Sequence, residues 1–101
     1  MARYKFEPSS KFSKEYKKLS ENDKIATKEV INLLLNGEKL PAKNKDHSLT
    51  GNLKDYRECH IKPDLLMVYK IDKSVLILYC FRIGSHSELF GWFMFIFIKT
   101  S

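Results

Sequence analysis

Three apolar, strand-like runs in the second half of the chain are separated by only two short turns, and this feature constrains the fold most. The runs are residues 56–61, 65–71 and 75–83. The tripeptides between them, Lys62-Pro63-Asp64 and Asp72-Lys73-Ser74, consist of residues that favour tight turns. Connections of this length join neighbouring strands that run in opposite directions. The sequence therefore predicts an antiparallel meander of three strands.

The first third of the chain predicts one strand and two helices. Residues 3–7 alternate polar and apolar side chains, as a short strand does, and Pro8 ends the pattern. Ser9 and Ser10 are candidate N-caps for a first helix. Ser20 or Asn22 can cap a second helix, for which Asn36-Gly37 is a typical end. The expected apolar faces are Phe12, Tyr16 and Leu19 in the first helix, and Ile25, Val30, Leu33 and Leu34 in the second.

Residues 38–54 show neither a helical nor a strand period, and they predict a loop that is long enough to suggest function or flexibility. The expected order is therefore an N-terminal strand, a two-helix hairpin, a loop and a three-strand meander. This order indicates an α+β domain with both helices packed on one face of the sheet. A chain of 101 residues has room for one such domain.

Composition and charge narrow the class of partner. Lysine and arginine number 18 against 12 acidic residues, which gives a formal net charge of +6. A small basic domain is suited to polyanions, because contacts with phosphates release condensed counterions. A lysine-rich surface without a ligand is the alternative. Cys59 and Cys80 each lie in a strand-like apolar run and form no Cys-x-x-Cys pair, so neither a zinc knuckle nor a redox motif is indicated. Two buried free thiols fit a reducing compartment.

The chain is expected to act in the cytoplasm, without a membrane anchor. Charged residues in the first eight positions interrupt the apolar stretch that a signal peptide requires. The longest apolar run, residues 92–98, is far shorter than the roughly 20 residues that span a bilayer.

Several side chains suited to proton transfer fall on one expected face of the meander. Alternation places Glu58 and His60 on the face opposite Cys59 and Ile61, and if the latter pack under the helices, the former look out from a bare face. Arg82, opposite Ile77, Tyr79 and Phe81 by the same count, can join them. Histidine and glutamate act as general acids and bases, and arginine stabilises negative charge in a transition state.

Each of these residues also has a structural interpretation. A strand histidine is commonly a surface residue, Glu58 can pair with a lysine, Arg82 can form a structural salt bridge, and Asp64 is a normal turn residue. Three histidines and an acid can also bind a metal, but no ligand spacing supports a metal site.

Four ordered motifs resemble one known family. They are Lys45-Asp46-His47-Ser48-Leu49-Thr50-Gly51; Tyr56-Arg57-Glu58-Cys59-His60-Ile61; Pro63-Asp64-Leu65-Leu66 with Tyr69-Lys70; and Arg82-Ile83-Gly84-Ser85-His86-Ser87-Glu88-Leu89-Phe90. Together they resemble YafQ-type toxins of the RelE/ParE toxin–antitoxin superfamily. The resemblance implies a RelE-like toxin domain over residues 1–91. It also implies a bacterial, ribosome-dependent endoribonuclease that is silenced by a cognate antitoxin.

The resemblance also implies roles for individual residues. His47, His60, Asp64 and His86 would form the acid–base set, Arg82 would neutralise phosphate, and Phe90 would position a base. Glu58 stands where relatives carry aspartate, which leaves its role open. The implied reaction is attack of a ribose 2′-OH on the adjacent phosphate, with at least two titratable groups and no metal or other cofactor. Which group is the base and which the acid stays open.

The expected partners are mRNA on the ribosome, ribosomal RNA and the antitoxin, with the toxin itself a monomer. Lys11, Lys14, Lys17 and Lys18 on the first helix are candidate contacts for ribosomal RNA, or equally a solvated helix face. An antitoxin would bring acidic and apolar segments to the basic surface.

Residues 92–101 extend beyond the resemblance and contain an aromatic, apolar run. This extension can be an added strand, a cover on the core, a segment that obstructs the site, or a segment without function.

Two other functions stay open beside the nuclease. One is a ParE-like toxin that binds a topoisomerase, and the other is an inactive module that binds RNA or an antitoxin.

Overall fold

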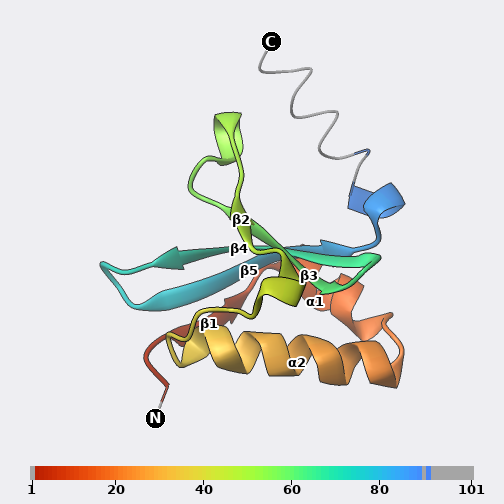
Figure 1. The fold of residues 1–101 in the computed structure, drawn as a ribbon, viewed down its shortest axis with the longest axis horizontal. Coiled ribbons are helices and arrows are strands. Elements are labelled where there is room, and N and C mark those ends of the chain that lie inside the picture. Colours follow the sequence, from red (N-terminus) through yellow and green to blue (C-terminus); the bar gives the residue numbers. More distant parts are fainter. Residues whose placement is uncertain (1, 90, 92–101) are drawn as a thin grey trace.

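A mixed five-stranded sheet forms the centre of the computed structural model, which describes residues 2–89 and 91 (Figure 1). The strand order is β1-β5-β4-β3-β2. Two helices, α1 (Ser10–Lys17) and α2 (Glu21–Leu35), lie on one side of the sheet. The strands are β1 (Lys5–Pro8), β2 (His47–Ser48), β3 (Arg57–Lys62), β4 (Leu65–Asp72) and β5 (Ile77–Gly84). Two short 3₁₀ turns, η1 (Ala42–Asn44) and η2 (Gly51–Leu53), flank β2.

Both helices begin and end where local sequence signals place them. The Ser9 hydroxyl accepts a hydrogen bond from the Phe12 amide, and Ser20, not Asn22, caps α2 through the Asp23 amide. Gly37 follows the Asn36 C-cap with φ +76°, a left-handed conformation that glycine adopts without strain. The predicted helical hairpin is confirmed.

The main core fills the space between the helices and the sheet. It contains Phe12, Val30, Ile31 and Leu34 from the helices and Cys59, Ile61, Met67, Tyr69, Leu78, Cys80 and Ile83 from the strands. Ile25 was expected on the buried face of α2 but is 54% exposed. It lies about half a turn around the helix from Thr27, which is fully buried.

The antiparallel meander of β3, β4 and β5 is confirmed, with small shifts of its ends. β5 begins at Ile77 and not at Val75, because Val75 and Leu76 are exposed turn residues and Leu76 has φ +56°. Two further pairings were not predicted. β1 runs parallel to β5, and β2 lies within the segment expected to be a loop and pairs with β3.

The face of the sheet opposite the helices is not bare, in contrast to the prediction. Leu66 and Val68 on this face are buried beneath Leu89, with Leu49, Tyr56 and Phe81 packed around them. The η2 segment and residues 85–89, which follow β5, rise from this side of the sheet (Figure 1). The site residues on this face therefore lie at the margin of a small second core.

A β-bulge in β5 also changes the predicted alternation. Val68 pairs with Arg82 and Tyr69 with Cys80, so Phe81 is an extra residue. Tyr79 and Phe81 both contact the Tyr56 ring, whereas they were expected on the face opposite Arg82. Arg82 pairs with Val68 on this same face because the bulge shifts the register by one residue. Among the residues that the structure describes, no helix is long and apolar enough to cross a membrane.

Candidate active site

His86 and Asp64 form a close pair between the end of β5 and the β3–β4 turn. Asp64 Oδ1 lies 2.6 Å from His86 Nδ1, and it also accepts a hydrogen bond of 2.9 Å from the His86 amide. Both side chains are more than half exposed. The two hydrogen bonds from His86, the backbone one first, lower the pKa of the Asp64 carboxyl below its usual value. Asp64 is therefore ionised at neutral pH and holds His86 from two directions.

A capping box fixes the turn that carries His86. The Ser85 hydroxyl accepts from the Glu88 amide at 3.2 Å, and Glu88 Oε1 accepts from the Ser85 amide at 2.7 Å. Residues 86–89 are helical, and Leu89 anchors them on the sheet. The hydrogen bonds from Ser85 lower the pKa of Glu88. His86 is thus the first residue of a helical turn that is tied down at both ends.

His60 lies beside His86, which brings together three of the four predicted acid–base residues. The ring centroids of His60 and His86 are 5.5 Å apart, with the planes at 61°. Both rings line a pocket of about 490 Å³. The other residues that line it are Lys43, Asn44, Lys45, Ile61, Lys62 and Pro63.

His47 forms a second pair of histidine and carboxylate. It lies opposite Glu58 in the β2–β3 register, with Nε2 3.4 Å from Glu58 Oε1. Its Nδ1 lies 2.8 Å from the Lys45 carbonyl oxygen, while Glu58 is only 8% exposed. His60 follows Glu58 by two positions on the same face of β3, about 7 Å along the strand. His47 is therefore the next site residue along this face, although it does not line the same pocket.

A network that the sequence did not reveal holds the loop with His47 against the sheet. Asp46 accepts hydrogen bonds from the Arg57 guanidinium and from the Tyr69 hydroxyl, the latter at 2.5 Å. Arg57 also donates to the Ser48 hydroxyl at 2.7 Å. Burial and the Asp46 carboxylate raise the pKa of Tyr69, so its hydroxyl stays protonated as a donor. The only sequence signal was the position of Asp46 directly before His47.

Arg82 is bound by Glu15 of α1. The Glu15 carboxylate accepts from Nε and from Nη2 of Arg82, the latter at 2.7 Å, and from the Ile83 amide at 3.1 Å. The Arg82 side chain is 12% exposed and does not line the His60–His86 pocket. The structure thus shows the structural salt bridge that was the alternative interpretation of Arg82, and a contact with phosphate requires this pair to open.

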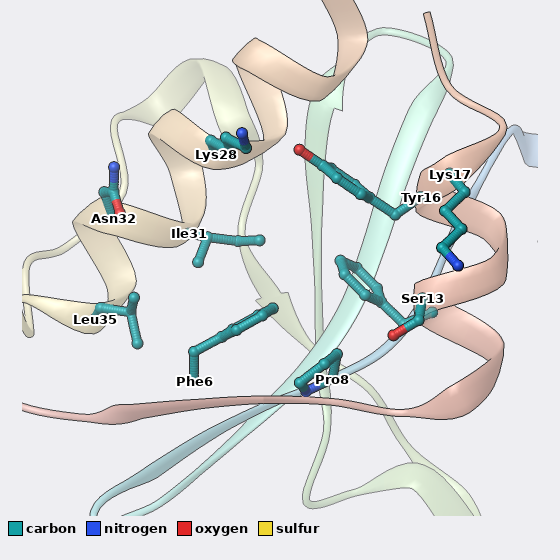
Figure 2. A pocket seen from close by; sticks show the side chains of 10 residues that line it. Phe6, Pro8, Ser13, Tyr16, Lys17, Lys28, Ile31, Asn32 and Leu35 are labelled. Atoms are coloured by element: carbon teal, nitrogen blue, oxygen red, sulfur yellow. The ribbon is translucent and has the colours of Figure 1, made fainter. Parts of the chain in front are cut away.

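The four predicted RNA-binding lysines of α1 are all exposed. Lys17 lies at the rim of an apolar pocket of about 500 Å³ between α1, α2 and β1, opposite Lys28 (Figure 2). Aromatic and aliphatic side chains such as Phe6, Tyr16 and Ile31 form most of its wall. Because none of the predicted acid–base residues lines this pocket, we place the candidate active site on the other side of the sheet.

The remaining predictions concern Phe90, the C-terminal extension, a metal site and the two cysteines. Phe90 and the extension 92–101 lie outside the described residues. Within residues 2–89 and 91, no group of three or more His, Cys, Asp or Glu side chains is arranged to hold a metal ion. Cys59 and Cys80 are buried free thiols, and burial raises the pKa of Cys80 to about 12.

Comparison with known proteins points to a single family. The family model of YafQ, a bacterial toxin of type II toxin–antitoxin systems, matches residues 4–91. The mRNA interferase toxin YafQ of Escherichia coli K12 is 38% identical over 88 residues, covering 84% of this chain and 94% of that protein. The crystal structure of the E. coli DinJ–YafQ toxin–antitoxin complex matches with a TM-score of 0.77 and 36% identity, covering 88% of this chain and 99% of that chain. A metal-bound toxin from Helicobacter pylori matches with a TM-score of 0.78 and 47% identity over the same shares.

Proposed function

The chain belongs to the YafQ family of toxins of type II toxin–antitoxin systems, and we propose that it cleaves ribosome-bound mRNA as a metal-independent endoribonuclease. The observation that carries this proposal is the Asp64–His86 pair with His60 beside it over a lysine-lined pocket. The E. coli relative named an mRNA interferase supports the choice of substrate. Ribosomes and mRNA place this activity in the bacterial cytoplasm.

The proposed reaction is attack of a ribose 2′-OH on the neighbouring phosphorus, which breaks the bond to the 5′ oxygen of the next nucleotide. The products are a 2′,3′-cyclic phosphate and a 5′-OH. One group must accept the 2′ proton and another must protonate the departing oxygen. His86 and His60 lie close enough to serve the two sides of one phosphate.

Asp64 determines which nitrogen of His86 takes part. Its ionised carboxylate accepts a hydrogen bond from Nδ1–H, so a neutral His86 carries its lone pair on Nε2. We assign proton exchange with the RNA to Nε2, with Asp64 stabilising the charged ring that forms. His47 and Glu58 form the flanking pair, and Arg82 becomes a phosphate ligand when it leaves Glu15.

We further propose that the toxin is a monomer that a cognate antitoxin silences. The E. coli relative is known in complex with DinJ. A net charge of +6 and four exposed lysines on α1 and its C-cap favour an acidic partner segment. The same surface is suited to ribosomal RNA when the antitoxin is absent.

Mapping of 5′ ends on an mRNA in a translating extract tests the proposed function. We expect new ends only on ribosome-bound message, and none with His86→Ala. The matched control Lys73→Gln changes an exposed lysine in the β4–β5 turn and should cleave as the unchanged protein does. Equal cleavage of naked RNA would contradict ribosome dependence. Arrest of DNA replication without cleavage would favour a topoisomerase-binding toxin.

Metal independence needs its own measurement. Protein treated with a chelator and then dialysed should contain less than stoichiometric metal by mass spectrometry and should retain its cleavage rate in the extract. Restoration of a lost rate by added copper or zinc would contradict this part of the proposal.

A further inference from the structure

The η1 turn is fixed against the active-site strand by a buried asparagine. Asn44 is 3% exposed, and its Nδ2 donates a hydrogen bond of 2.8 Å to the carbonyl oxygen of His60. Lys45, the next residue, adopts a left-handed conformation with φ +46°, which is uncommon for a side chain of this kind. The Lys45 carbonyl oxygen in turn contacts Nδ1 of His47. One short turn is therefore tied to two of the site histidines.

This turn places two lysines in the wall of the His60–His86 pocket. Lys43 and Lys45 flank Asn44, are exposed and line the pocket, as does Lys62. The ammonium group of Lys62 is paired with Asp23 at 2.6 Å. Within the described part of the chain, neither Lys43 nor Lys45 has an acidic partner, and Asp46 beside them is occupied by Arg57 and Tyr69. The pocket thus contains two ammonium groups that form no ion pair with the described residues.

We propose that Lys43 and Lys45 bind the phosphate that adjoins the scissile one, so that the pocket is a second phosphate subsite for single-stranded RNA. This inference rests on the proposed function and names its substrate more narrowly: at least two consecutive phosphodiesters. The two histidines act at the scissile phosphate, so the lysines that line the same pocket meet a neighbouring one. The pocket has a volume of about 490 Å³, within the range of roughly 300–1,000 Å³ that holds whole small-molecule ligands. It therefore has room for more than a single phosphate group.

Short RNAs that resist cleavage test the subsite by binding alone. The probes are a 2′-O-methyl dinucleotide with one phosphodiester and a 2′-O-methyl trinucleotide with two, neither carrying a terminal phosphate. Binding is followed in nuclear magnetic resonance titrations of the unchanged full chain through the Asn44 side-chain amide and the rings of His60 and His86. We expect the trinucleotide to bind roughly tenfold more tightly, the ratio that one added charge-assisted contact provides.

Two variants test whether Lys43 and Lys45 cause the difference in affinity between the two probes. In Lys43→Gln/Lys45→Gln the advantage of the trinucleotide should be lost, while Lys73→Gln should keep it. Equal affinities for the two probes in the unchanged protein would overturn the proposal. So would an advantage that persists in the double variant, or no effect of either probe on the three pocket signals at millimolar concentration. Because no cleavage is measured, failure of the subsite is distinguishable from failure of the nuclease function.

Discussion

At the scale of single residues, one carboxylate oxygen contacts both the backbone and the ring of His86. Asp64 Oδ1 accepts a hydrogen bond from the backbone amide of His86 and lies 2.6 Å from Nδ1 of the same residue. The backbone contact holds the start of the helical turn, and the ring contact turns Nε2 away from Asp64. Substitution of either partner therefore changes the orientation of Nε2, the atom that we propose for proton transfer, as well as the charge of the site.

Replacement of His86 by glutamine separates proton transfer from folding. Glutamine keeps a polar side chain on the helical turn but cannot exchange a proton near neutral pH. We expect cleavage in the translating extract to fall by a factor of about 10² to 10⁴, the usual contribution of one general acid or base. Circular dichroism melting should change little, because the side chain is 57% exposed. An unchanged cleavage rate would remove His86 from the proposed mechanism.

Replacement of Asp64 by asparagine should change how stability depends on pH. His86 lowers the pKa of Asp64 in the folded protein. The contribution of Asp64 to stability is therefore fully present above the pKa of the unfolded chain, which is near 3.9. That contribution is lost as the pH falls through the lowered pKa, because the carboxyl must then take up a proton. We expect the unchanged protein to melt above Asp64→Asn at pH 6, with the two melting temperatures converging below about pH 4. A constant difference between pH 6 and pH 3 would show that the charge is not responsible.

At the scale of elements, β2 depends on side chains from other strands more than on its own two residues. Arg57 in β3 and Tyr69 in β4 both bind Asp46, which directly precedes His47. The position of one site histidine is therefore determined by a buried hydroxyl on the central strand.

Removal of that hydroxyl is expected to lower the stability of the fold. Tyr69→Phe keeps the ring, which is 1% exposed, and loses the bond to Asp46. A hydrogen bond to a charged group contributes about 1.5–3 kcal/mol, so the free energy of unfolding in urea should fall by about that amount. Tyr79→Phe is the matched control, since its hydroxyl has no hydrogen-bond partner among the residues described. A loss of equal size in both variants would contradict the role of the network.

Elements built from local signals were predictable, whereas those that depend on distant contacts were not. The serine caps, Gly37 and the apolar spacing are local sequence signals for α1 and α2, and the two tight turns predicted the meander. β2 has two residues and no period of its own, so only its partner strand reveals it. The bulge at Phe81 likewise breaks the alternation without any glycine or proline to signal it.

In the candidate site, too, the sequence did not predict the features that depend on distant contacts. The four predicted acid–base residues came from the family resemblance, and the structure brings Asp64, His60 and His86 together because two turns meet at one end of the sheet. Lys43 and Lys45 were not singled out, because a loop without period gives no orientation for its side chains. Glu15, the partner of Arg82, lies 67 positions away in the chain, a separation that no local pattern spans.

At the scale of the whole molecule, the sheet separates a large core from a small one. The large core lies between the sheet and the helices and supplies most of the buried apolar side chains. The small core, Leu66, Val68 and Leu89 with its neighbours, lies on the face that carries the site. Stability and site geometry therefore depend in part on different sides of one sheet.

A pair of leucine truncations tests this division. Leu89 in the small core and Leu78 in the large core are 1% and 0% exposed, so either change to alanine should cost about 2–5 kcal/mol in urea unfolding. Only Leu89 lies in the turn that begins at His86. At a temperature where both variants are folded, cleavage should fall in Leu89→Ala and stay near the original rate in Leu78→Ala. If either alanine variant does not fold, Leu89→Val and Leu78→Val provide the same contrast with a smaller loss. Equal losses of activity at equal stability would show that the small core has no separate role in holding His86.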